Sequence, residues 1–161
     1  MNTGQIILTV GAMMLFSFIV ISFGDLQSNF TTISLMNESI VTGSGICQSI
    51  VDEINAKSFD ETTVGGAITV KEGLTVSASL GPDGGETNYL LYDDVDDFDN
   101  HVRTVFSERL GDFVATVTVS YVNFNTPDTE SMTRSFYKKV SVEVTTDLLD
   151  GTITQTSVVS Y

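Results

Sequence analysis

Hydrophobic residues dominate the start of the chain. Residues 6–23 run for eighteen positions without a charged residue or a proline. A helix rises ~1.5 Å per residue, so this run covers about 27 Å, close to the ~30 Å hydrocarbon core of a bilayer. The pattern predicts a hydrophobic N-terminal helix over residues 1–24 that serves as a membrane anchor or packs against helices of its own kind. The residues expected to contact lipid or neighbouring helices are Ile6, Ile7, Leu8, Val10, Gly11, Ala12, Met13, Met14, Leu15, Phe16, Phe18, Ile19, Val20, Ile21 and Phe23.

A secretory signal peptide is also N-terminal and apolar, but it has a basic segment before the apolar run and a small-x-small cleavage site after it. Here the first cation of the chain is Lys57, and residues 22–25 do not form such a cleavage site. The sequence therefore favours a retained helix. A removed signal peptide and the buried helix of a soluble domain are the alternatives.

After Gly24 the helical pattern continues but becomes amphipathic. Apolar or small residues recur at alternating spacings of three and four, which places them on one face of a helix. They are Ile33, Met36, Ile40, Gly43, Cys47, Ile50 and Ile54. We therefore expect residues 25–58 to continue the first helix, so that one helix runs from about residue 3 to about residue 57.

From residue 59 onward the hydrophobic period changes to two, which is typical of β-strands. Strands are predicted at residues 67–71, 74–80, 113–121, 140–144 and 152–161, with a tight turn at 72–73 and an exposed, mobile loop at 123–135. Alternation with one polar face implies an antiparallel sheet that is solvated on one side. The amphipathic half of the helix is expected to cover the other side. The predicted fold class is α+β, a long N-terminal helix packed on a small antiparallel β-sheet head formed by residues 59–161.

Charge excludes some partners. Seven Lys and Arg residues against 21 Asp and Glu residues give a net charge of −14, which disfavours binding to nucleic acid. The single cysteine, Cys47, cannot form an intramolecular disulfide and is expected to be a small buried residue. Asn29 and Asn37 fit the N-glycosylation pattern, and the sequence leaves their modification open.

The densest group of chemically active side chains is acidic. Hard cations such as Ca²⁺ take six to eight oxygen ligands, and a flexible acidic loop can supply them. A Ca²⁺ site is one interpretation of this segment, with Asp93, Asp94, Asp96, Asp97 and Asp99 as candidate ligands. The other is an acidic, solvated loop that is held to the core by Tyr92, Val95 and Phe98. The spacing departs from that of an EF-hand loop, and beyond this Ca²⁺ no cofactor is expected.

Catalytic motifs are missing from the sequence. His101 is the single histidine, and no nucleophile motif surrounds it. The chain also has no phosphate-binding loop, dinucleotide fingerprint or metal-spaced His/Cys pair. We expect no enzyme and no catalytic residue.

A charge-poor N-terminal helix, its amphipathic continuation and a small antiparallel sheet together resemble the type IV pilin and pseudopilin superfamily. Local strings are similar to those of mannose-sensitive haemagglutinin type minor pilins. These strings are residues 48–54, 56–61, 81–84, 93–99 and 138–145. The resemblance covers nearly the whole chain.

The resemblance implies a structural subunit that moves from the inner membrane of a bacterial cell envelope into an extracellular helical filament. Its implied partners are copies of itself, the membrane before assembly and the pilus assembly machinery. Such pilins usually have a basic leader that is cut after a glycine, and a Glu at the fifth mature position. Here Gly4 is the candidate cut site, the preceding residues include no basic one, and Thr9 stands where the Glu is expected. Gly11 and Ala12 are small enough for close helix approach.

The alternative is a monomeric, membrane-anchored minor pseudopilin or surface binding module of a secretion or adhesion system. Its recognition surface would be the loop at residues 123–135. A hydrolase is disfavoured by the missing nucleophile and base.

Overall fold

A computed structural model describes residues 2–161, and the chain forms two compact units. The first unit ends at Glu38, and the second runs from Ser39 to Tyr161. Helix α1 (Thr3–Asn55) supplies the first unit and the first seventeen residues of the second. The continuous helix expected from the sequence is therefore confirmed, with its C-terminal end at Asn55.

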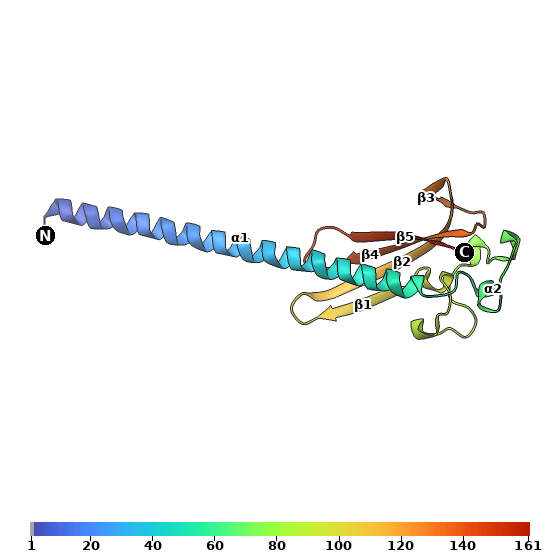
Figure 1. Ribbon diagram of the computed structural model, residues 1–161. Coiled ribbons are helices and arrows are strands. Elements are labelled where there is room, and N and C mark those ends of the chain that lie inside the picture. The colour runs from blue at the N-terminus through green and yellow to red at the C-terminus, as the bar shows by residue number, and fades with distance from the viewer. Residues whose placement is uncertain (1) are drawn as a thin grey trace. The chain divides into compact units, whose positions relative to one another are not determined.

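The second unit carries a five-stranded antiparallel sheet, on which the C-terminal part of α1 packs (Figure 1). The strands are β1 (Val102–Ser107), β2 (Gly111–Asn123), β3 (Thr126–Ser131), β4 (Tyr137–Thr145) and β5 (Ile153–Ser160). Their order is β1-β2-β4-β5, and β3 pairs with the C-terminal end of β2. The α+β fold class is confirmed. The remaining elements are α2 (Glu61–Val64) and four 3-10 turns, η1 (Lys71–Gly73), η2 (Ser77–Ser79), η3 (Tyr89–Leu91) and η4 (Asp96–Phe98).

Buried apolar residues alternate with more exposed residues along the two central strands, β2 and β4, and form the core of this head. Phe113, Ala115, Val117, Val119 and Tyr121 on β2 are all at most 3 % exposed. The register sets β2 residues against β4 residues of the same face, for example Val117 against Val142. Cross-strand pairs of β-branched residues stabilise a sheet of this kind.

Helix α1 covers this apolar face with the late part of its predicted stripe. Cys47, Ile50 and Ile54 are at most 2 % exposed, whereas Ile33, Met36 and Ile40 remain 37–54 % exposed. At Gly43 the helix comes so close to β5 that a Cβ atom would overlap the side chain of Ile153. A larger residue there would require the end of the Ile153 side chain to move.

Two predictions for the head were wrong. Neither segment 67–71 nor segment 74–80 forms a strand: the first ends where the 3-10 turn η1 begins, and the second contains η2. Leu74 is buried, but the neighbouring backbone N–H of Thr75 donates to the side chain of Asp60, not to a strand. Segment 123–135 is not a loop throughout, because it contains β3, which pairs with β2. Strand β1 was not predicted, because its residues are only half-buried on one face.

Candidate functional site

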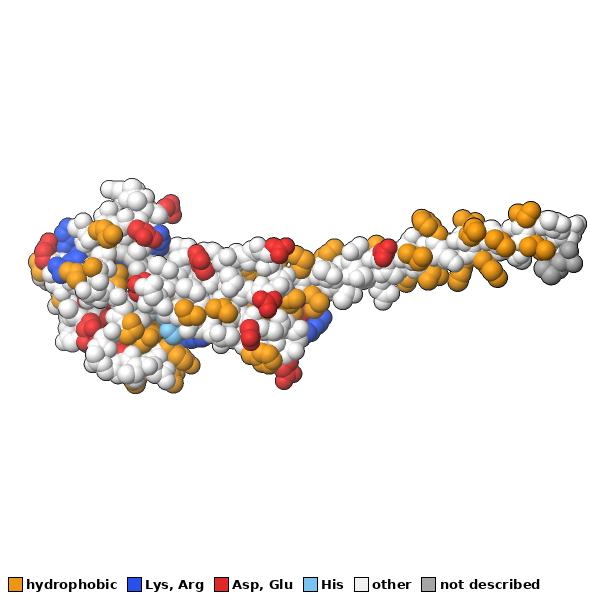
Figure 2. All heavy atoms as spheres, turned by 180° about the vertical axis from the view of Figure 1, so that it is seen from behind, with side chains coloured by type: hydrophobic (Ala, Val, Ile, Leu, Met, Phe, Trp, Pro, Cys, Tyr) orange, Lys and Arg blue, Asp and Glu red, His pale blue; other side chains and the backbone are white. Residues whose placement is uncertain are grey.

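The first candidate site is the apolar surface of the first unit. Each large hydrophobic side chain between Ile6 and Phe23 is 45–73 % exposed. Figure 2 shows hydrophobic side chains distributed around this part of the helix. Within the described residues, α1 is the one helix that is long and apolar enough to cross a membrane, and none of its most apolar window is buried.

Polar side chains in this segment are compatible with lipid. The hydroxyl of Thr9 donates to the carbonyl oxygens of Gln5 and Ile6, each at 2.9 Å, and the hydroxyl of Ser17 donates to Met13 O at 2.9 Å. These bonds satisfy the hydroxyl hydrogens inside the helix, as an apolar surrounding requires. The candidate cut site Gly4 lies in the first turn of α1, and Gly11 has open space around its Cα.

The second candidate site is the acidic segment, and its environment corrects the expectation of a solvated loop. Asp94, Asp96 and Asp97 are 1–3 % exposed. The anchoring role of Tyr92, Val95 and Phe98 agrees with the structure, because these residues are buried as well. A parallel bridge between Ser58 and Asp94 draws the segment inward, with Ser58 N–H bound to Asp93 O and Val95 N–H bound to Ser58 O, each at 3.0 Å.

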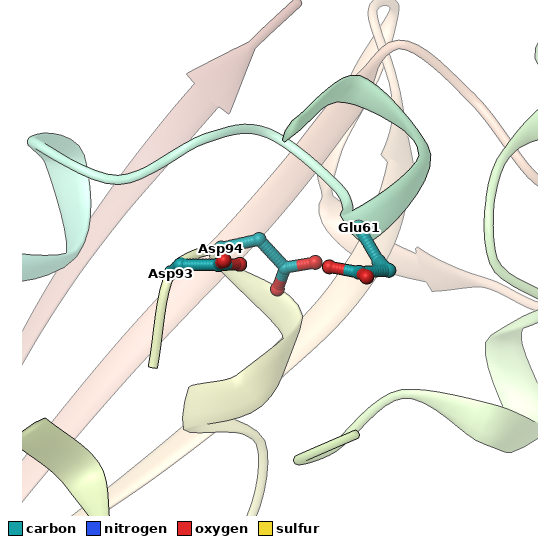
Figure 3. A group of neighbouring side chains, drawn as sticks. All are labelled: Glu61, Asp93 and Asp94. Carbon is teal, nitrogen blue, oxygen red and sulfur yellow. The ribbon is translucent and has the colours of Figure 1, made fainter. Parts of the chain in front are cut away.

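The five candidate Ca²⁺ ligands do not form one group. Asp93 and Asp94 meet Glu61 of α2 (Figure 3), and Asp93 and Asp97 meet Glu86, with the carboxylate oxygens of each group within 4.8 Å of one another. Asp96 instead binds Lys138. Asp99 accepts from the Val119 N–H at 2.8 Å and from the Asn100 side chain at 2.7 Å. Glu61 and Glu86 were missed, and no spacing in the sequence connects them to this segment.

Burial and crowding raise the pKa of several of these carboxyl groups. Burial, and then the neighbouring Asp96, raises the pKa of Asp94 to about 9. Burial likewise raises the pKa of Asp97 to about 7, with Glu86 adding to the effect. Burial and the charge of Asp93 raise the pKa of Glu61. Like charges in contact cannot all ionise, so this corner of the head holds protons near neutral pH and a cation would compete with them.

A third site, which the sequence reasoning missed, lies inside the core. Lys138 on β4 has no exposed surface. Its Nζ donates to the carbonyl oxygen of Phe59 at 2.6 Å, to Asp60 Oδ2 at 3.1 Å and to Asp96 Oδ1 at 2.5 Å. Nζ also lies 4.6 Å from the Phe59 ring centroid and 5.3 Å from the Tyr121 ring centroid. Its three N–H donors thus meet three oxygen acceptors beside two aromatic rings.

Asp60 is the most heavily bonded member of this network. Besides Lys138, it accepts from the Thr62 N–H at 3.2 Å, the Thr75 N–H at 2.9 Å and the Tyr121 hydroxyl at 3.2 Å. Burial acts to raise the pKa of Asp60, but Lys138, Thr62 and Thr75 outweigh it and hold the pKa below its ordinary value. A sequence signal for the network did exist. Lys138 shares its face of β4 with Val140, at the spacing of two that marks buried positions.

His101 and Cys47 have structural surroundings. The His101 ring lies 5.5–6.0 Å from the rings of Tyr89, Tyr92 and Phe98, and burial followed by the charge of Arg103 lowers its pKa. Cys47 is fully buried, and burial raises the pKa of its thiol. Both environments favour neutral side chains that pack in the core.

Comparison with protein families, with curated proteins and with solved structures finds no match to this chain. Its arrangement of a long apolar N-terminal helix followed by an antiparallel sheet is pilin-like at the level of fold class. A closer assignment depends on the residues themselves.

Proposed function

We propose that the chain is a structural subunit of a type IV pilin-like bacterial filament, similar to minor pilins of the mannose-sensitive haemagglutinin type. In this proposal the N-terminal helix holds the subunit in the inner membrane and then packs against helices of other copies in an extracellular filament. The assembly machinery of the envelope transfers it from one to the other.

One observation carries the proposal. The apolar side chains of residues 6–23 are exposed all round the helix, and the head has a core of its own. Such a surface requires an apolar medium, which either lipid or a bundle of neighbouring helices supplies. Exchanging lipid for helices keeps the same side chains out of water, so one segment serves both states.

The decisive experiment is the intact mass of the protein in filaments sheared from cells, compared with the membrane fraction. We expect the protein in the sheared fraction, where its mass also shows whether cleavage follows Gly4. Protein that is found in membranes alone would contradict the proposal.

Replacement of Gly11 separates assembly from anchoring. Gly11→Leu adds bulk where helices approach closely, so we expect loss of the sheared filaments with unchanged membrane insertion. Leu15→Ile conserves volume on the same helix and is the matched control. Normal filaments from Gly11→Leu would contradict packing at this position.

The alternative, a monomeric anchored binding module, is favoured by one groove in the head. Val122, Asn123, Phe124, Pro127, Tyr137, Val158 and Ser160 line a cavity of about 400 Å³. Phe124 is 73 % exposed there, and its ring centroid lies 5.6 Å from that of Tyr137. Protein confined to membranes and monomeric in detergent would favour this function.

A further inference from the structure

The buried lysine has the surroundings of a reactive group. In most proteins a lysine keeps its ammonium group in water, whereas Lys138 has no exposed surface at all. Two carboxylate oxygens, Asp60 Oδ2 and Asp96 Oδ1, lie within hydrogen-bond distance of its Nζ. The rings of Phe59 and Tyr121 lie over the same nitrogen and exclude water from it.

We propose that Lys138 and Asp96 become joined by an intramolecular isopeptide bond. The reacting groups already touch, since Nζ lies 2.5 Å from Asp96 Oδ1 and the carbon that it would attack, Cγ, is bonded directly to that oxygen. Holding two groups in such contact converts a slow bimolecular reaction into an intramolecular one with effective molarities of roughly 10⁵–10⁸ M. Exclusion of water also protects the amide product from hydrolysis.

The reaction is a condensation that needs no oxidant, reductant or cofactor. A bond forms between Lys138 Nζ and Asp96 Cγ, and one Cγ–O bond breaks. Two of the three ammonium protons leave with that oxygen as water, and the third stays on the amide nitrogen. The positive charge of Lys138 and the negative charge of Asp96 disappear together, so the net charge of the protein is unchanged.

A neighbouring carboxyl group supplies the proton transfers. Asp60 touches Nζ and is positioned to accept the proton that the ammonium must lose before the amine attacks. The proton that Asp60 accepts is then available to the oxygen that leaves Cγ, which departs as water.

Asp96 is a better electrophile than Asp60 for a structural reason. The carboxylate of Asp60 accepts bonds from Thr62, Thr75 and Tyr121 in addition to Lys138, and these donors stabilise its ionised form. Of these donors, Asp96 is bonded to Lys138 alone. The geometry therefore assigns the bond to Asp96 and the role of base to Asp60.

The test is mass spectrometry of the full chain, purified in detergent and denatured. We expect tandem spectra of protease digests to contain a branched peptide in which Lys138 is linked to Asp96, lighter than its two parts by one water. This readout uses the unaltered protein and does not depend on processing at the N-terminus. Recovery of the Lys138 peptide as an unlinked species would overturn the proposal, and a branch to Asp60 would overturn the assignment to Asp96.

Variants test which residues take part in forming the link. Asp96→Ala should restore the water mass and the linear Lys138 peptide, while Asp99→Asn, in the same segment but bonded to β2, should keep the branch. Asp60→Asn preserves shape but removes the base, so the linked fraction should form more slowly by about 10²–10⁴-fold, the usual contribution of a general base. A folded Asp60→Asn protein that links as fast as the unaltered chain would contradict the role of Asp60. The inference is independent of the proposed filament function.

Discussion

The two units of this chain distribute apolar and charged groups in opposite ways. In the first unit, apolar side chains such as Phe16 and Ile19 are 62–68 % exposed. In the second, Lys138 and four aspartates are buried at 3 % exposure or less. The first unit therefore depends on an apolar medium that the chain does not supply, whereas the head encloses charged groups and must satisfy them internally. The predictions below test this contrast from both sides.

The largest effect is expected from removing the buried cation. Lys138→Met would leave Asp60 and Asp96 without their shared partner in the core and would also prevent the proposed link to Asp96. Loss of one member of a buried ion pair by itself costs about 3–5 kcal/mol. Denaturant unfolding of the full chain in detergent measures this cost. Lys139→Met is the matched control, because Lys139 pairs with the exposed Glu130 at 3.4 Å and should change stability by less than about 1 kcal/mol. Equal losses of stability in the two variants would contradict the special contribution of the buried lysine.

On the first unit the reverse substitution should be costly. Ile19→Arg places a charge within the apolar run, and insertion of a charge at the centre of a membrane helix costs about 2.5–3.5 kcal/mol. We expect a larger share of the protein to be released from membranes by alkaline carbonate. Ile19→Leu should stay in the membrane pellet. Full retention of the arginine variant would show that this segment does not meet lipid.

Two glycines of the same helix should respond in opposite directions. Gly43→Ala adds a Cβ that overlaps the flexible end of the Ile153 side chain, so we expect a loss near the lower end of the about 1–3 kcal/mol that overpacking costs. Gly45→Ala has open space and should gain up to about 1 kcal/mol from helix propensity. Thermal unfolding compares the two variants. A stable Gly43→Ala protein would contradict the close approach of α1 to β5.

Head stability should fall as pH rises above 5. The unfolded carboxyls are ionised there, whereas the folded head raises the pKa of Asp94 to about 9 and of Asp97 to about 7 and so retains protons. Raising the pH toward these pKa values removes the protons from the folded state, with an expected loss of up to about 1.4 kcal/mol per pH unit for each proton that the folded state retains. The opposite contribution of Asp60, whose pKa is lowered, is lost at acidic pH below this window. Asp94→Asn should flatten the slope measured by denaturant midpoints, and Asp128→Asn should not.

The smallest effect is expected from divalent cations. Subunits of net charge −14 repel one another, so assembly of the proposed filament should tighten slightly with salt, and more with Ca²⁺ held near Glu61, Asp93 and Asp94. Sedimentation of sheared filaments at equal ionic strength, with CaCl₂ or with NaCl and EDTA, distinguishes the two. Identical sedimentation would argue against a specific cation.

Local periodicity was enough to predict the elements that pack by alternation. The helix of residues 3–55 and strands β2 and β4 follow from spacings of three to four and of two, because burial on one face imposes those spacings. The turns at η1 and η2 could not be predicted, since the backbone N–H of Thr75, which lies between them, donates to the side chain of Asp60, fifteen residues earlier. A contact between distant residues leaves no trace in local pattern.

The candidate sites differ in the same way. The exposed apolar run of the first unit is visible in composition alone. The network of Lys138 joins residues 42 and 78 positions apart, and the sequence offered only the inward position of a lysine on an alternating strand. The acidic residues at 93–99 were predicted to be solvated because charged side chains are usually exposed. In the structure part of this segment is buried, and Lys138 of β4 is the partner of its Asp96.

The contacts of Cys47 bear on how the protein is made. Its thiol lies against the carbonyl oxygens of Val142 and Ile153, which follow it by 95 and 106 residues. During synthesis the C-terminal turns of α1 therefore leave the ribosome long before the strands that cover them, and so do Asp60 and Asp96 before Lys138. Folding of domains rich in such distant contacts is slow. The head consequently completes its core only when the last two strands arrive, after the N-terminal helix has had time to enter a bilayer.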